Sequence, residues 1–377
     1  MSVPVVVVSG IDPILLDVAT FSAATDTPDA VVLRAALTGD ATAVRLTTST
    51  AWGVESDETV EMVGGCAGCS LQQQVLAQLH GLMHGSRRGG RPGAVVLTLP
   101  AGVAATPLAR QLVPGSTAAD LDVHLAAVVS TVDLDTAVPD LLGEIGVRDR
   151  GLALCAADAR SVAHALSAQL QPADLVLTRG SGAAGSVLVD HLRGAGSARG
   201  ELTDTPAGGW FAARHNPVLA ERRLDPRRLT VPERPESNGV WTLTLTSTRP
   251  LHPHRWRAIA ESLDSAPVRS RGAFALPTRP GRVAGWDAAG GQLLIRDLPV
   301  QDGASWAAAT RLQFTGMQGR RTDIARAFES ALLTDAELAL PAAAWGPMDD
   351  GLDPWLGDRV RDGAQRDQAD ASRSSRA

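Results

Sequence analysis

Two cysteines on a glycine-rich turn are the residues in this sequence best suited to chemistry. Residues 64–70 read Gly-Gly-Cys-Ala-Gly-Cys-Ser, so two residues separate Cys66 from Cys69. Thiolates at this spacing before a helix can hold one zinc ion, or form a redox pair whose thiol pKa the helix N-terminus lowers. A third interpretation is that small residues simply pack at a tight turn. We take Cys66 and Cys69 as candidate metal ligands; a closed four-ligand zinc site would need two more.

Two histidines follow the cysteines along the chain. His80 and His84 are four residues apart, which places them on one face of a helix. If that helix begins near Ser70, His80 lies about 11 residue rises, or roughly 16 Å, from Cys69. One ion cannot bridge that distance. The sequence therefore predicts a solvated or capping role for both histidines.

The first strand and turn have the layout of a P-loop but lack its chemistry. The β-branched run Val3–Val8 leads to Gly10 and then to Asp12 and Pro13. A P-loop needs glycine N–H groups around the phosphates, a lysine on them and a Ser or Thr on Mg²⁺. Pro13 removes an N–H donor, and the charge of Asp12 repels phosphate. The whole chain contains no lysine, so we expect no GTP cofactor, no catalytic residues and no enzyme activity.

Alternating strands and helices predict an α/β fold for the first part of the chain. Buried-strand patterns at Val3–Val8, Ala94–Leu99, His124–Val132 and Leu175–Thr178 alternate with helical patterns at Leu71–Met83 and Ala159–Leu170. Such alternation is typical of a parallel sheet covered on both faces. We expect a degenerate P-loop NTPase-like domain over residues 1–226. A proline- and charge-rich linker at 227–239, a smaller α+β domain at 240–340 and an acidic, then disordered tail at 341–377 would follow.

Composition sets limits on location and partners. The chain has 377 residues, a net charge of −6 and three cysteines. An odd, small number of cysteines argues against a disulfide framework and for a reducing compartment. No apolar run is long enough for a membrane span, and the N-terminal run is not preceded by basic residues as in a signal peptide. We expect a cytoplasmic protein with no membrane and no DNA partner.

The motifs in this order resemble those of the CobW-like GTPases, a family of zinc metallochaperones. The resemblance is carried by the degenerate P-loop strand, the Gly-Cys-x-x-Cys segment, Val128–Asp133, Ala173–Leu177, Arg249–Pro253, Arg271-Gly272 and Gly285-Trp286. It implies a CobW C-terminal domain for the second part of the chain. The chain departs from the family motif Cys-x-Cys-Cys, because Gly68 replaces the middle cysteine. Its GTPase residues are absent as well, so GTP hydrolysis is not implied.

One actinobacterial branch of this family fits the departures. The chain resembles its mycobacterial-type recruitment factor for a ribosome hibernation protein, which is linked to zinc starvation. This resemblance implies a zinc-responsive, ribosome-associated factor. Such a factor would recruit or stabilise a hibernation-promoting factor on the small subunit, contacting rRNA and ribosomal proteins, without GTP hydrolysis. The alternatives are a nucleotide-independent zinc metallochaperone and an active GTPase with an unusual loop.

Arginine clusters are the candidate contacts with ribosomal RNA. Arg87, Arg88 and Arg91 lie in a glycine-rich loop, and the planar guanidinium can bind two phosphate oxygens. Further clusters occur at 222–228 and at 320–321. The alternative is an ordinary solvated surface. The acidic segment 349–358 would be repelled by RNA and could face a basic ribosomal protein instead.

Overall fold

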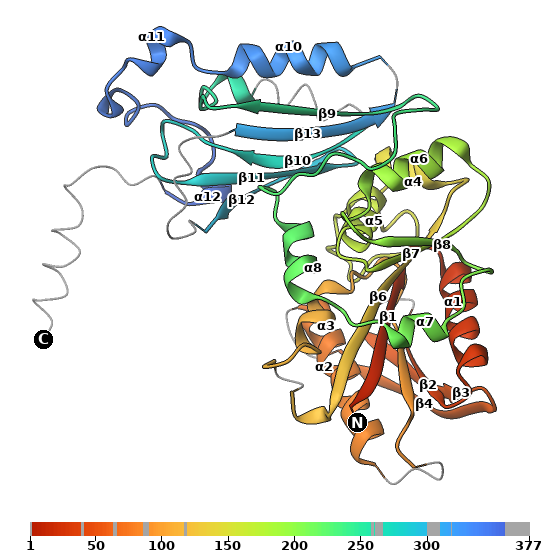
Figure 1. Cartoon of the computed structure of the whole chain (residues 1–377). Helices are drawn as coiled ribbons and strands as arrows, with labels where there is room; N and C mark the ends of the chain where they lie inside the picture. The colour runs from red at the N-terminus through yellow and green to blue at the C-terminus, as the bar shows by residue number, and fades with distance from the viewer. Residues whose placement is uncertain are drawn as a thin grey trace, which may run out of the picture. The chain divides into compact units, whose positions relative to one another are not determined.

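The computed structural model describes residues 2–38, 41–62, 66–85, 90–116, 119–257, 260, 267–299, 310–317 and 319–358. Its contacts divide the chain into two units between Val240 and Trp241, at the start of strand β9. Each unit is built around its own sheet (Figure 1).

The first unit contains an eight-stranded sheet in the order β4-β3-β2-β5-β1-β6-β7-β8. The strands are β1 (Val3–Gly10), β2 (Ala30–Leu37), β3 (Ala43–Thr50), β4 (Gly53–Glu61), β5 (Ala94–Thr98), β6 (Val123–Asp133), β7 (Leu175–Arg179) and β8 (Ala198–Glu201). All pair in parallel except β3 and β4, which form an antiparallel hairpin at one edge. The predicted α/β class with a mostly parallel sheet is confirmed.

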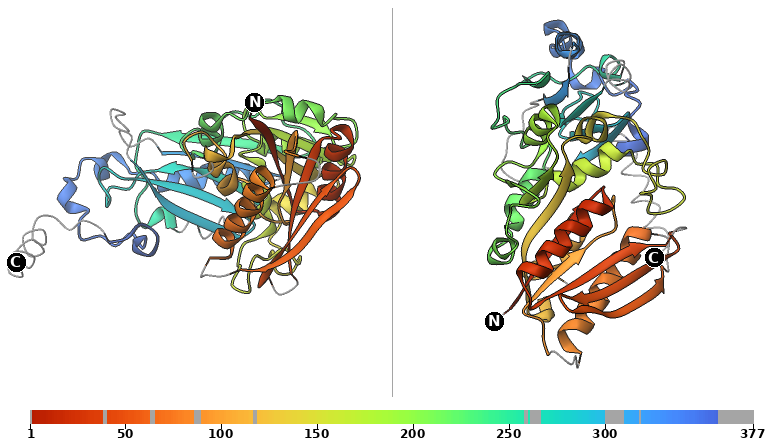
Figure 2. Two further views of the ribbon diagram at one scale, coloured as in Figure 1. Left: turned by 90° about the horizontal axis from the view of Figure 1, so that it is seen from below. Right: turned by 90° about the vertical axis from the view of Figure 1, so that its right-hand side faces the viewer.

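Helices cover both faces of this sheet, and this burial on both sides explains the continuous apolar run of strand β1. The helices are α1 (Pro13–Asp26), α2 (Ala67–His84), α3 (Thr106–Gln111), α4 (Ala137–Leu142), α5 (Val162–Leu170), α6 (Ala183–Leu192), α7 (Gly208–Ala212) and α8 (Pro217–Leu224), with a 3-10 turn η1 (Ala119–Leu121). Val5 and Val7 of β1 join the core that contains α2, whereas Val6 and Val8 join the core that contains α1. Helices α1 (red) and α2 (orange) lie on opposite sides of the sheet (Figure 2). Alternate side chains of a strand point to opposite faces, so a strand covered on both sides must be continuously hydrophobic. Within the described part of the chain, no helix has the length and apolar character needed to cross a bilayer.

The second unit contains a five-stranded sheet in the order β12-β11-β10-β13-β9. Its strands are β9 (Val240–Ser247), β10 (Val268–Phe274), β11 (Val283–Ala289), β12 (Gln292–Leu298) and β13 (Thr310–Met317), with helices α10 (Arg321–Ala331), α11 (Asp335–Leu338) and α12 (Asp353–Leu356) and a 3-10 turn η2 (Ala342–Ala344). Neighbours β11–β12, β10–β11 and β10–β13 are antiparallel. The predicted smaller α+β domain is therefore confirmed.

Aromatic side chains fill the core of the second unit. The rings of Trp256, Phe274 and Trp286 lie 5.4, 6.0 and 6.1 Å apart in their three pairings. Trp241 is buried in the same core. Three tryptophans therefore belong to the core of the second unit.

The segment predicted as a linker is instead attached to the first unit. Arg234 donates to the Asp190 carboxylate of α6 at 2.9 Å, and Arg193 bonds Glu233 at 3.2 Å. Leu229 is buried. Ion pairs with α6 thus hold a proline- and charge-rich stretch against the unit that precedes it, which composition alone did not reveal.

The start of the predicted acidic tail is also part of a folded unit. Leu352 and Leu356 join the core of the second unit, and Trp345 is buried. Asp350 is buried as well and pairs with Arg279. The expectation of a separate tail beginning at residue 341 is therefore wrong up to residue 358, and residues 359–377 lie outside the described part of the chain.

Candidate functional site

Cys66 and Cys69 lie at the start of helix α2. Cys66 is the N-cap residue, with an extended backbone, and its Sγ accepts a hydrogen bond from the backbone N–H of Cys69 at 3.3 Å. Both cysteines are exposed and neither forms a disulfide. An N-cap acceptor satisfies one of the free donors of the first helical turn. The fold therefore holds both sulfur atoms on one helical turn that solvent can reach.

The two thiols are not equivalent. A hydrogen bond from the Cys69 thiol, together with backbone N–H groups of the turn, lowers the pKa of Cys66. The same bond to Cys66, with burial and charge repulsion adding to it, raises the pKa of Cys69. Cys66 is therefore the first of the pair to become a thiolate, which is the form that binds metals and attacks disulfides.

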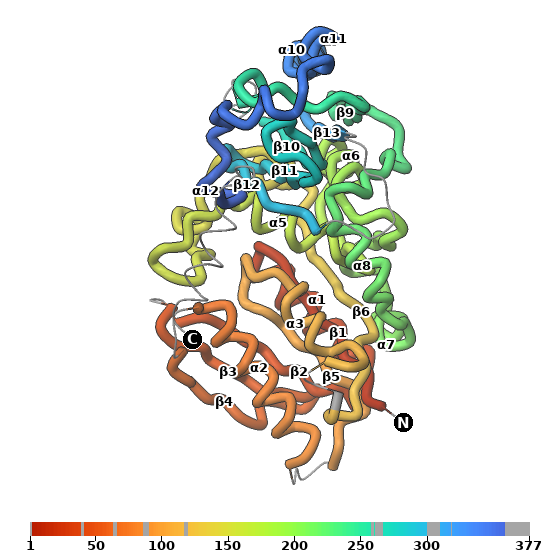
Figure 3. Tube along the Cα trace, turned by 90° about the vertical axis from the view of Figure 1, so that its left-hand side faces the viewer, coloured from red at the N-terminus to blue at the C-terminus, as the bar shows by residue number. Residues whose placement is uncertain are grey.

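The sheet determines where this pair lies. Strand β4 ends at Glu61 beside Ala43, and the backbone N–H of Met62 donates to Thr42 at 2.9 Å. Because β3 runs antiparallel to β2, this end of the hairpin lies at the edge where the parallel strands terminate. Helix α2 starts at that edge and packs back over β2 and β3 (Figure 3). Cys66 is thus at the carboxyl edge of the sheet, where α/β folds usually place their ligands.

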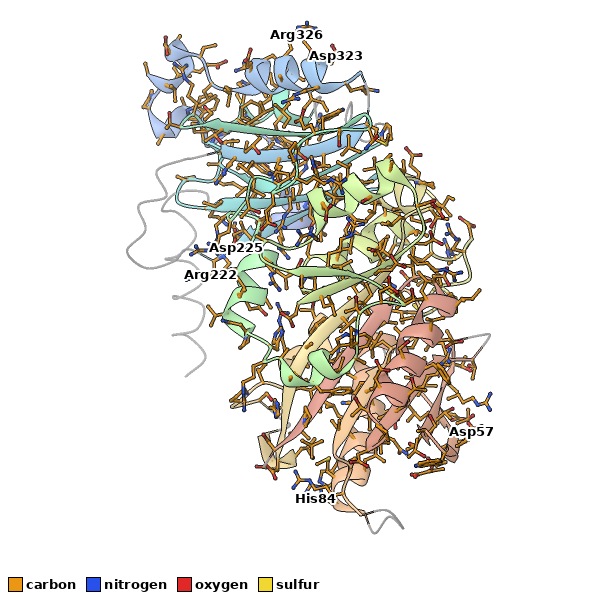
Figure 4. All side chains as sticks on the ribbon, turned by 45° about the vertical axis from the view of Figure 1, so that its right-hand side comes forward. Asp57, His84, Arg222, Asp225, Asp323 and Arg326 are labelled. Carbon is orange, nitrogen blue, oxygen red and sulfur yellow. The ribbon has the colours of Figure 1, made fainter. Side chains whose placement is uncertain are left out.

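His80 and His84 are at the other end of the same helix. Their rings stack with centroids 4.3 Å apart, and α2 is unbroken from Ala67 to His84. His84 is labelled in Figure 4, at the far end of α2. The predicted separation of the histidines from the cysteines is confirmed. No set of three or more metal-binding side chains comes together among the residues that the structure describes.

At the P-loop position, the turn is closed by its own aspartate. The Asp12 carboxylate accepts hydrogen bonds from the backbone N–H groups of Ile14 at 2.7 Å and Leu15 at 3.3 Å. These are the donors that a helix N-terminus offers to phosphate. The strand–turn–helix layout is as predicted, and a negative charge already occupies its anion-binding end.

Gly10 has a packing role that the sequence did not reveal. A Cβ atom at Gly10 would lie 2.2 Å from Oγ1 of Thr131 on the neighbouring strand β6. The Gly10 carbonyl accepts bonds from the N–H of Gly102 at 2.9 Å and from Nε2 of Gln169 at 3.1 Å. Contact with β6 therefore requires a glycine at this position whether or not phosphate binds.

The arginines predicted to contact RNA give a divided result. Arg87 and Arg88 lie outside the described residues. Arg91 forms an ion pair with Asp122 at 2.8 Å and also donates to the Asp122 carbonyl at 2.7 Å. This guanidinium lowers the pKa of the Asp122 carboxyl. The pair with Asp122 already occupies part of the Arg91 guanidinium and offsets its charge, which weakens its attraction for phosphate.

The arginines around α8 have structural roles. Arg223 is buried and donates to the carbonyls of Ala173 and Ala195 at 2.9 Å each. Arg227 bonds the Asp225 carboxylate at 2.8 Å, near the end of the helix where Figure 4 labels Arg222 and Asp225. Two members of this cluster therefore stabilise the first unit from inside it, which neither the RNA-contact nor the solvated-surface interpretation predicted.

A cavity of about 540 Å³ lies at the carboxyl edge of the first sheet. Arg34, Arg148 and Cys155 line it together with apolar side chains. None of these three residues belongs to a motif in the sequence, and Cys155 is half-buried. These residues come from separate segments of the chain, so no local motif could have indicated the cavity.

Comparison with known proteins identifies the domain in the second unit. Residues 240–332, which span β9 to the end of α10, match the family described as the cobalamin synthesis protein cobW C-terminal domain. The second unit therefore contains a CobW C-terminal domain, as the motifs of that part of the chain predicted.

Particular relatives extend the similarity to the first unit. The chain is 26% identical over 357 residues to "Zinc chaperone Rv0106" of Mycobacterium tuberculosis, covering 81% of this chain and 82% of that protein. The same values hold for "Uncharacterized protein Mb0109" of Mycobacterium bovis. Among solved structures, the Zn(II)-bound YjiA GTPase from E. coli matches 88% of this chain and 100% of its own at 13% identity, with a TM-score of 0.35.

Proposed function

We propose that this chain is a zinc chaperone of the CobW-like class, which carries its cargo at Cys66 and Cys69 and works without nucleotide hydrolysis. The observation that carries the proposal is the exposed cysteine pair at the start of α2. It occurs in a chain 26% identical to a protein named a zinc chaperone. The cysteine pair and this relative support the zinc-related part of the expected function, and not its ribosomal part.

The chemistry of the pair suits a metal that has to be passed on. Zinc binds thiolates, and the lowered pKa of Cys66 makes one available first. Binding at Cys69 then releases a second proton, since the metal competes with protons for sulfur. Two sulfurs supply half of a tetrahedral shell. We propose that water or the receiving protein fills the other half, so that transfer proceeds by exchange of ligands.

Independence from nucleotide rests on the Asp12 cap. Its carboxylate accepts the N–H groups of Ile14 and Leu15, and the chain has no lysine to neutralise a phosphate at this turn. A bound nucleotide would have to displace an internal hydrogen bond and meet a like charge. The proposal therefore assigns this turn a structural role only.

Competition against a chromophoric zinc chelator tests the cargo site. Under reducing conditions, the chain should withdraw zinc from the chelator, and Cys66→Ser with Cys69→Ser should lose this ability. Cys155→Ser is the matched control, because it removes the third cysteine and leaves the pair intact. If the double variant competes as well as the unmodified chain, the cysteine pair is not the zinc site.

A second measurement distinguishes zinc binding from a redox role for the same cysteine pair. The lowered pKa of Cys66 also favours attack on disulfides. Titration against glutathione buffers reports whether Cys66 and Cys69 form a disulfide in the range of cellular potentials. A pair that stays reduced throughout, and binds zinc, supports the chaperone; a pair that oxidises readily and ignores zinc supports redox chemistry.

Ribosome association stays a prediction of the family resemblance. It would place this CobW-like protein on the small subunit with a hibernation-promoting factor, and zinc would act as its signal. Arg91 is engaged with Asp122, so we propose the zinc chaperone as the primary function.

A further inference from the structure

The cavity at the carboxyl edge of the first sheet has the features of a ligand site. Its lining comes from α1 (residues 13 and 16), from the end of β2 and the residues after it (34–38 and 41), from the segment after β5 (99–101), and from the loop between α4 and α5 (148, 151–153, 155 and 156). Its volume of about 540 Å³ falls within the range of roughly 300–1,000 Å³ that is usual for small-molecule pockets.

Hydrogen bonds hold the loop that forms one wall of the cavity. The N–H of Val147 donates to the Arg160 carbonyl at 2.9 Å, and Arg160 donates to the Gly102 carbonyl at 3.2 Å. Gly102 has a positive φ of 80°, and a Cβ there would lie 3.1 Å from Leu152. The wall is thus fitted to the turn after β5, and the site is formed before any ligand arrives.

The charges that line the cavity have one sign. Among the described lining residues, the charged side chains are Arg34 and Arg148, in a chain whose net charge is −6. Arg34 pairs with Asp17 of α1. Arg148 donates to the neutral carbonyl of Ala156 at 3.1 Å. A guanidinium has five N–H donors, so both arginines keep donors for an anion.

The remaining lining is mostly apolar. Leu16, Leu37, Leu99 and Leu152 are among these residues, with Pro13 and Pro100. We propose that the cavity binds a small organic anion, whose carboxylate, sulfonate or phosphate group meets Arg148 and Arg34 and whose apolar body packs against the leucines. Asp12 and the two residues whose backbone N–H groups it caps, Ile14 and Leu15, are not among the lining residues.

The fluorescent anion 1-anilinonaphthalene-8-sulfonate is a suitable probe, and N-phenyl-1-naphthylamine is its neutral counterpart. Arg148→Gln should weaken binding of the anion about five- to tenfold, the loss expected for one charge-assisted hydrogen bond at a partly exposed site. It should leave the neutral compound unchanged. Arg110→Gln is the matched control, because Arg110 is an exposed arginine of the same unit that pairs with Glu221. Equal losses for both probes, or for both variants, would overturn the proposal.

Cys155 locates the probe. In a Cys66→Ser, Cys69→Ser background, Cys155 is the one thiol left of the three, and alkylation by iodoacetamide reports its access. The anion should slow this alkylation, and Ala153→Trp, which fills the cavity from its loop wall, should abolish binding of both probes. Unchanged alkylation at saturating probe would place the binding elsewhere and refute the site. This background lacks the proposed zinc ligands, so the result does not depend on the zinc function.

Discussion

Arg279 and Asp350 form an ion pair inside the second unit, with Nε and Oδ2 2.9 Å apart and side chains 2% and 0% exposed. Thr278 donates a second bond to the same carboxylate at 2.7 Å. Burial alone would raise the pKa of Asp350, but bonds from Arg279 and Thr278 outweigh it and lower that pKa. This pair joins the segment after α11 to the loop between β10 and β11.

Removing one partner should be costly. Asp350→Ala leaves the buried Arg279 guanidinium with Asp353 as a carboxylate partner at 2.6 Å. Because a buried charge left with no partner costs about 3–5 kcal/mol, we expect a smaller loss here, about 2–3 kcal/mol in the unfolding free energy of the second unit. Urea unfolding followed by tryptophan fluorescence measures it. Asp297→Asn is the control, because Asp297 pairs with Arg282 at a partly exposed site, where the effect should stay below about 1 kcal/mol. Similar losses for both variants would refute a special role for the buried pair.

Acid should destabilise the second unit through Glu337. Two hydrogen bonds from Arg255, at 2.7 Å each, lower the pKa of Glu337 from 4.5 to about 2. A carboxyl whose pKa is lowered on folding stabilises the fold above its unfolded pKa, and this contribution disappears as the pH falls through the folded value. Stability should therefore decline from about pH 4.5 towards pH 2. Glu337→Gln should flatten that decline and Glu329→Gln on α10 should not, as urea midpoints across this range will report.

Substitutions at Asp12 test two properties of this turn: its contribution to stability as a helix cap, and its predicted inability to bind nucleotide. Asp12→Ala should destabilise the first unit by about 1 kcal/mol, the usual effect of losing an N-cap. Asp12→Asn keeps a capping oxygen and should stay close to the unmodified chain. Thermal unfolding compares them. Calorimetry with GTP and Mg²⁺ should show no micromolar binding for any of the three, and such binding to the unmodified chain would contradict our interpretation of this turn.

Because Gly10 and Thr131 are in close contact, we predict that a substitution at Thr131 restores part of the stability lost on substituting Gly10. Gly10→Ala places a methyl group 2.2 Å from the Thr131 hydroxyl, and overpacking of this kind costs about 1–3 kcal/mol. Thr131→Ala removes the hydroxyl, so the double variant should recover part of the loss. A double-mutant cycle of unfolding free energies measures this coupling. Additive losses would mean that the strands move apart instead.

Ribosome association can be tested by pelleting through a sucrose cushion with ribosomes, with and without a hibernation factor and zinc. The family resemblance predicts co-pelleting of the chain in at least one of these four conditions. If it pellets, Arg91→Gln tests the contribution of the Arg91 guanidinium, and a variant with Arg87 and Arg88 changed to Gln tests the rest of that loop. Failure in all four conditions would leave the zinc chaperone as the remaining proposal.

Local sequence patterns were enough to predict much of the fold and part of the candidate site. Strand β1 could be predicted because both of its faces are buried, which makes its run of valines continuous. The cysteine pair could be predicted because its geometry is set within one helical turn. Asp350 was assigned to an acidic tail because its partner Arg279 is 71 residues away. The cavity likewise depends on Arg34 and Arg148, which only the tertiary fold brings to one place.

The Asp12 cap has a consequence for the order of steps in the proposed working cycle. In switch proteins built on P-loops, contacts with the terminal phosphate hold one conformation. Hydrolysis removes these contacts and converts the protein to its second conformation. Here the donors of that turn are satisfied within the chain. In the proposed function, no irreversible step therefore drives the working cycle in one direction. Loading and delivery of the metal would follow mass action, and the relative affinities and concentrations of donor, carrier and recipient would decide the direction of flow.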